Sequence, residues 1–191
     1  MKHLLRKLFF WDAPAQGAQG SVLTASREKA IAAECSIVIK YPSAHATMPG
    51  MEMDICAKYR WFRFRYDFPA RVIVDGVQRN YLLRRSYFGS RLWLFDDFTN
   101  EEIFWRQDFL SGSSFRTIQG EKIGELKTAL LTHQETVLHD CRCNSSVRIS
   151  LVKSLQKSKE YKALVPSGFD YRLLLFFMVL EFDDDIYSYT P

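Results

Sequence analysis

The sequence contains few cysteines and no long apolar run. Its 191 residues include four cysteines, which is too few for the disulfide framework of a small secreted domain and favours a reducing, cytosolic compartment. The longest uninterrupted apolar run, Leu173 to Leu180, has eight residues, whereas a transmembrane helix needs ~20. We therefore expect neither a domain stabilised by disulfide bonds nor a transmembrane segment.

Motifs that carry catalytic chemistry are also missing. The sequence has no phosphate-binding P-loop, zinc-protease helix, nucleophile elbow or dinucleotide-binding glycine pattern. His139, Cys141 and Cys143 alternate and would share one face of a strand, but a structural zinc site needs four ligands, so we interpret the thiols as part of a buried sheet face. The run Asp183 to Asp185 lacks the spacing of a calcium loop. We expect no catalytic residue, no metal, no cofactor and no enzymatic activity.

The first eleven residues combine basic and apolar side chains. The apolar part is short and interrupted by charges, so we predict no secretion signal. In a helical conformation one sector would hold the apolar residues Leu4, Leu5, Leu8, Phe9 and Trp11, opposite Lys2, His3, Arg6 and Lys7. This pattern is typical of a helix lying at a membrane surface. Packing of the helix against the protein's own folded domain explains the pattern equally well.

Aromatic residues are abundant, at 15% of the chain, which is typical of sheet surfaces. Residues 57–68 alternate Phe62, Phe64 and Tyr66 on one face with Arg63 and Arg65 on the other, as a half-buried strand does. Further short β-like segments follow at hairpin spacing as far as residue 152. Eight or more strands with few helices between them predict an antiparallel sandwich or barrel.

The C-terminal segment 170–186 is predicted to be a buried helix. It begins with Asp170, a residue suited to an N-cap, and contains no Gly or Pro. A helix that is apolar around most of its circumference must be buried, and this one is too short for a bilayer. A barrel of about ten or more strands has an interior wide enough to admit one helix. We therefore predict that this helix is the core of a β-barrel.

The order of these motifs resembles the tubby C-terminal-like superfamily, and within it the LURP-one-related and phospholipid scramblase branch. The resemblance rests on a Y-x-L strand after Asp75-Gly76, G-S-R-L-x-x-x-D at 89–96, E-I-x-W at 102–105, G-E-K-I-G-E-L at 120–126 and a final D-Y-x-L-L-L helix. It covers roughly residues 57–188. It implies a closed antiparallel barrel of twelve strands around the C-terminal helix, and a non-enzymatic protein that binds phosphoinositides or other lipids or acts in signalling. We do not expect scramblase activity, because this sequence lacks the cysteine-rich stretch and the membrane-inserting character of scramblases.

The resemblance gives a domain division, and the low cysteine content gives a compartment. We predict an N-terminal extension over residues 1–56, which has no counterpart in the resemblance, and a barrel domain over residues 57–191. We expect a cytoplasmic monomer, peripheral at a membrane.

Positive charge is concentrated in one third of the chain. Residues 58–91 hold nine Lys or Arg against two Asp, a net charge of +7, whereas residues 92–115 carry −4. Such a segment attracts anionic partners, although it also suits the solvated face of a strand. The candidate lipid-binding residues are Arg63, Arg65, Arg84, Arg85 and Arg91, for anionic phospholipid or phosphoinositide. Nucleic acid is the alternative partner, and it is disfavoured because no recognition motif is present.

Overall fold

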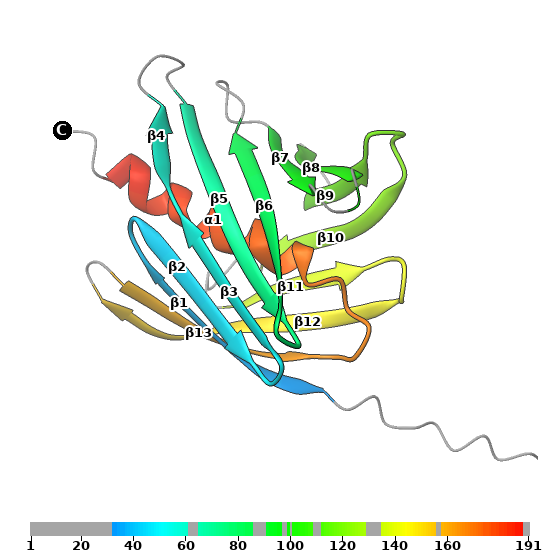
Figure 1. Cartoon of the computed structure of the whole chain (residues 1–191), viewed down its shortest axis with the longest axis horizontal. Helices are drawn as coiled ribbons and strands as arrows, with labels where there is room; N and C mark the ends of the chain where they lie inside the picture. The colour runs from blue at the N-terminus through cyan, green and yellow to red at the C-terminus, as the bar shows by residue number, and fades with distance from the viewer. Residues whose placement is uncertain are drawn as a thin grey trace, which may run out of the picture.

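The computed structural model describes residues 32–60, 65–85, 91–96, 99, 101–108, 112–128, 135–155 and 158–188. These residues form thirteen strands and one helix (Figure 1). The strands are β1 (Ala33–Lys40), β2 (Ser43–Met48), β3 (Met51–Cys56), β4 (Lys58–Arg60), β5 (Arg65–Val74), β6 (Val77–Arg85), β7 (Arg91–Asp96), β8 (Glu101–Asp108), β9 (Gly112–Thr117), β10 (Lys122–Thr128), β11 (Glu135–Asp140), β12 (Ser145–Leu155) and β13 (Ser158–Val165), and the helix is α1 (Arg172–Ser188).

The strands form one closed antiparallel barrel. The ring runs from β5 through β6 and onward to β13, then through β1, β2 and β3, and the pairing of β3 with β5 closes it. The short strand β4 also pairs with β5, beyond the break at Ala57, so β3 and β4 together occupy one position. The ring therefore has twelve positions, and the predicted fold is confirmed.

Among the described residues the barrel begins at Ala33, and not at residue 57 as the resemblance predicts. Ala33 to Ile39 of β1 pair with Val165 to Lys159 of β13, and Met51 to Ile55 of β3 pair with β5. The ring cannot close without these strands. The predicted amphipathic helix, with Leu4, Leu5, Leu8, Phe9 and Trp11, lies outside the described residues.

Helix α1 runs through the ring of strands and forms the core (Figure 1). Every residue from Leu173 to Val179 is at most 1% exposed. Because these side chains point in all directions around the helix, only a surrounding barrel can bury all of them. The rings of Phe176 and Phe115 lie 5.1 Å apart, and those of Phe177 and Tyr161 lie 5.2 Å apart. The predicted buried helix is confirmed.

Asp170 caps this helix. Its backbone carbonyl accepts a hydrogen bond from the Leu173 N–H at 3.0 Å, and its carboxylate accepts one from the Arg172 N–H at 3.0 Å. A capping carboxylate satisfies N–H groups that have no partner within the helix. The helix begins two residues later than predicted, because Asp170 and Tyr171 precede its first turn.

Gly124 allows β10 to lie against the core. A Cβ atom at this position would lie 2.8 Å from the backbone oxygen of His139 and 3.0 Å from Leu173 Cδ1. The backbone oxygen cannot move aside without disturbing the pairing of β10 with β11. We expect Gly124→Ala to lower the free energy of unfolding by about 1–3 kcal/mol, measured by urea denaturation. Lys127→Ala on the exposed side of the same strand is the control, and an equal loss for both variants would contradict this close approach.

Candidate functional site

Of the five predicted arginines, the structure describes the side chains of Arg84, Arg85 and Arg91. Arg63 lies outside the described residues, and only the backbone of Arg65, the first residue of β5, is described. Arg84 and Arg85 are neighbours on β6, so their side chains point to opposite faces. Arg85 is in register with the buried Leu92, and Arg84 with the partly exposed Trp93. Arg85 therefore faces inward and Arg84 faces outward.

Arg84 neutralises a buried carboxylate. Its Nε donates a hydrogen bond to Asp67 Oδ1 at 3.3 Å, and the Asp67 side chain is 6% exposed. The guanidinium carbon lies 5.4 Å from the centre of the Phe95 ring, within the range of a cation–π contact. A buried carboxylate needs such a partner. Arg84 is thus held by two contacts on the outer wall.

Arg91 is the exposed one of the three predicted arginines whose side chains the structure describes. It is the first residue of β7 and is in register with Arg106 of β8. An exposed guanidinium on the outer wall can bind anionic oxygens.

The outer wall beside these arginines carries aromatic rings that the sequence did not single out. Trp93 and Phe95 of β7 and Phe104 of β8 are partly exposed, although the core lies on the other side of the wall. The Trp93 and Phe104 rings lie 5.1 Å apart. Residues 92–95 are apolar on both faces of the strand, so the period-two pattern does not show which residues face outward.

Together these residues form what we call the arginine–aromatic face. Arg116 of β9 borders it, since it is in register with Phe104, and its guanidinium donates to the carbonyl of Gly120 at 3.0 Å. Glu102, in register with Phe95, is an acidic neighbour. The face consists of Leu82, Arg84, Arg91, Trp93, Phe95, Phe104 and Arg116. Such a surface offers flat apolar rings together with donors for anionic oxygens.

A second polar cluster closes the barrel at the N-terminus of α1. The Arg172 guanidinium contacts Asp170 at 2.7 Å, Glu101 at 2.6 Å and Asp96 at 3.4 Å. Burial alone would lower the pKa of Arg172, but the hydrogen bonds and charges of Asp170 and Glu101 outweigh it and raise the pKa. Arg172 therefore stays charged inside the barrel, where it joins strands β7 and β8 to the helix.

Asp140 ties the β11–β12 turn to the helix. One carboxylate oxygen accepts the N–H of Asp170 and the other accepts the N–H of Arg142, each at 2.9 Å. Burial would raise the pKa of Asp140, but these backbone donors outweigh it and lower the pKa. The cluster surrounds a cavity of about 380 Å³ that Tyr81 and Tyr171 also line. Its guanidinium groups and carboxylates bind one another and backbone N–H groups, as expected of a cluster that stabilises the fold.

The cysteine and histidine positions differ from the prediction. His139 is in β11, but the strand ends at Asp140, and Cys141 and Cys143 lie exposed in the following turn. The thiols therefore do not form a buried sheet face. Asn144, with φ of 50°, makes this tight turn. Among the described residues, no group of three or more His, Cys, Asp or Glu is placed to hold a metal ion.

Comparison of the chain with protein-family models, curated proteins and solved structures gives no match. Within the described part of the chain, no helix has the length and apolar character needed to cross a membrane.

Proposed function

We propose that this protein is a non-enzymatic, tubby-like barrel module that binds anionic phospholipid as a peripheral protein at a membrane surface. The observation that carries the proposal is the arginine–aromatic face. Its partly exposed rings, Trp93, Phe95 and Phe104, lie beside Arg91 on adjacent strands. Aromatic rings favour the level of lipid headgroups, and each basic residue near an anionic surface adds about 1 kcal/mol of attraction.

The architecture supports this function over catalysis. The helix occupies the middle of the barrel with large side chains, so the interior is a packed core. The polar cluster around Arg172 is engaged in ion pairs and helix capping. The resemblance to tubby-like proteins points the same way, because members of that superfamily associate with lipids. A phosphoinositide headgroup would supply the several anionic oxygens that guanidinium groups bind well.

We expect Arg91→Glu combined with Trp93→Ala to weaken association with anionic vesicles by at least about tenfold. The charge reversal replaces attraction with repulsion, and the second change removes the largest ring from the face. Flotation with phosphatidylserine vesicles, with and without phosphoinositide, measures the effect. Binding of the unmodified protein should fall steeply as salt rises.

Lys153→Glu is the matched control, because Lys153 is an exposed residue of β12, five positions around the ring from β7. Equal flotation of all three proteins, with circular dichroism showing that each is folded, would remove the arginine–aromatic face from the proposal. Titration with a non-specific DNA duplex tests the alternative partner. DNA binding that is lost in the double variant, without any flotation of the unmodified protein, would replace lipid by nucleic acid.

A further inference from the structure

The outer surface of the barrel carries a groove on the side opposite the arginine–aromatic face. In the twelve-position ring β13 lies six positions from β7. The groove has a volume of about 510 Å³ and is lined by Glu34 of β1, Ser146, Arg148 and Ser150 of β12, and Lys162, Ala163 and Leu164 of β13. This volume lies in the range of small-molecule sites, which combine apolar contact with a few polar groups.

The groove exists because β12 and β13 separate. Their pairing extends from Leu155 and Ser158 to Ile149 and Ala163. Beyond that point Ser145 to Arg148 pair with β11, and Leu164 and Val165 pair with β1. The facing edges of the two strands therefore present backbone N–H and C=O groups toward the groove, since alternate residues of a strand point to each neighbour.

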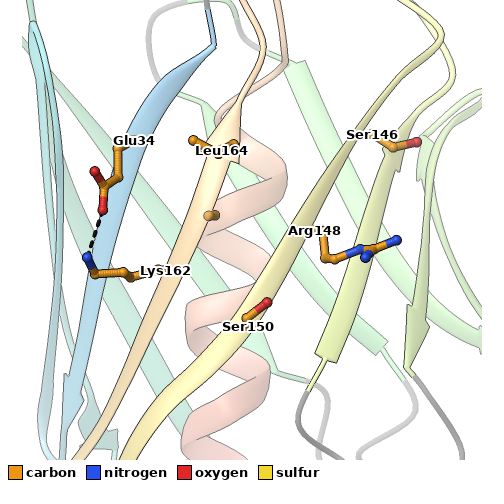
Figure 2. Close-up of a pocket in the computed structure, with 7 residues that line it drawn as sticks. Glu34, Ser146, Arg148, Ser150, Lys162 and Leu164 are labelled. Atoms are coloured by element: carbon orange, nitrogen blue, oxygen red, sulfur yellow. Dashed lines mark hydrogen bonds and ion pairs between the residues drawn. The ribbon is translucent and has the colours of Figure 1, made fainter.

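The two walls of the groove carry cations. Ser150 and Lys162 are in register across the ladder, and Arg148 is the next outward residue of β12. Figure 2 shows the Arg148 guanidinium extended away from Lys162. Among the described residues the guanidinium makes no hydrogen bond or ion pair, so the long side chain can turn toward the groove at little cost.

Glu34 holds the second cation in an exchangeable pair. Lys162 Nζ lies 2.8 Å from Glu34 Oε1 (Figure 2), and both side chains are about 60% exposed. Exposed ion pairs of this kind contribute little to stability. An incoming anion can therefore displace the Glu34 carboxylate and take over the ammonium group.

The groove also offers an apolar contact at its open end. Leu164, which is in register with Glu34, is 63% exposed. A large apolar side chain beside two cations and a hydroxyl matches a ligand that has both an anionic group and an apolar part.

We propose that the β12–β13 groove binds a small, freely diffusing amphiphilic anion, namely a phosphate or carboxylate group joined to a short apolar chain. Arg148, Lys162 and the Ser150 hydroxyl bind the anionic oxygens. Leu164 packs against the apolar chain. This site is independent of the proposed membrane contact, which lies on the opposite side of the barrel.

Titration of the full chain with hexyl phosphate and with hexanoate, followed by amide chemical shifts, tests this site in the absence of vesicles. We expect saturable shifts centred on Ser150, Lys162 and Leu164. Hexan-1-ol lacks the charge and inorganic phosphate lacks the chain, so each should bind at least about tenfold more weakly. If either bound as tightly as hexyl phosphate, or if neither amphiphile bound, the proposal would be overturned. A preference between the two amphiphiles identifies phosphate or carboxylate as the anionic group.

Three substitutions in the groove should change the affinity for the amphiphile, two by lowering it and one by raising it. Arg148→Gln should weaken binding of the preferred amphiphile by roughly tenfold, and Leu164→Ser should reduce it toward the level of inorganic phosphate. Glu34→Gln removes the competing carboxylate and should strengthen binding by roughly threefold. Arg71→Gln, at an exposed arginine of β5 paired with Asp54, is the control and should have no effect. Unchanged affinity for Arg148→Gln, in protein with unchanged thermal unfolding, would overturn the assignment.

Flotation separates this site from the proposed function. Saturating hexyl phosphate should leave flotation on anionic vesicles unchanged, because the groove faces away from β7. Loss of flotation would indicate that a lipid headgroup occupies the groove, and would overturn the assignment to a freely diffusing ligand. Failure of flotation in every condition would count against the membrane contact alone, since the shift titration uses no vesicles.

Discussion

Replacing Phe177 with aspartate is expected to abolish folding. Phe177 is 1% exposed, and its ring meets the Tyr161 ring edge-on at 5.2 Å inside the barrel. An aspartate there would be a buried charge without a partner, at a cost of several kcal/mol. That cost is comparable with the whole stability of a typical domain. We expect insoluble protein, or soluble protein without a cooperative thermal transition by circular dichroism.

Phe177→Leu is the control for this prediction. It keeps the position apolar and removes part of the ring volume, so the protein should fold with a loss of about 1–3 kcal/mol. Together the two variants separate the effect of charge from that of size. A Phe177→Asp variant that melts at the temperature of the unmodified protein would show that the helix is not the core of the barrel.

Much of the fold could be predicted because the strongest patterns are local. Residues 173–180 are apolar without interruption, and the only way to bury such a short helix on all sides is to surround it with protein. Hairpin turns such as Asp75-Gly76, both with positive φ, are also local features. These patterns, ordered as in the tubby-like resemblance, were sufficient to predict the closed barrel.

The start of the barrel domain could not be predicted in the same way, because the barrel is closed by pairing between strands that are far apart in the sequence. Strand β1 contains no aromatic residue and lies before the motifs that carry the resemblance, so its membership of the barrel was not predicted. Its place is set by pairing of Ala33 with Val165, at the other end of the described barrel. Such pairings depend on the complete ring, and a resemblance that begins at residue 57 does not reveal them.

The placement of the candidate arginines on the barrel could be predicted only in part, for two physical reasons. The alternation rule alone separates Arg84 from Arg85, so grouping both in one outward patch conflicts with strand geometry. The pairing of Arg84 with Asp67 depends on the register between β5 and β6, which the sequence does not show. Arg172 was not predicted as a functional or structural residue, because its three carboxylate partners lie on β7, β8 and the segment before α1.

Arg172→Met is expected to destabilise the protein by about 3–5 kcal/mol at pH 7, as removal of one partner from a buried ion pair typically does. The Arg172 side chain is 11% exposed and contacts Asp96, Glu101 and Asp170. The change leaves these carboxylates close together without their shared cation, at the end of the helix. Urea denaturation gives the free energy of unfolding of both proteins. Arg172→Lys keeps the positive charge but lacks the planar guanidinium group with its paired hydrogen-bond donors. It should give an intermediate loss in the free energy of unfolding.

The pH dependence of the free energy of unfolding gives a sharper test of the ion-pair cluster around Arg172. In the unmodified protein, burial would raise the pKa of Glu101, but hydrogen bonds from Arg142 and Arg172 outweigh it and lower the pKa. A carboxyl group with a lowered pKa in the folded state contributes stability that is full at neutral pH and is lost as the pH falls through the folded pKa. The unmodified protein should therefore lose stability on acidification.

Arg172→Met should behave differently on acidification, because protonation of the carboxylates that have lost Arg172 relieves their repulsion. The difference in free energy of unfolding between the two proteins should accordingly shrink as the pH is lowered from 7 toward 4. Arg142→Met removes the more exposed cation from the same cluster, with a side chain that is 37% exposed, and should cost less at pH 7. Equal losses for Arg142→Met and Arg172→Met, or a difference that widens in acid, would mean that Arg172 does not hold the barrel end together by charge.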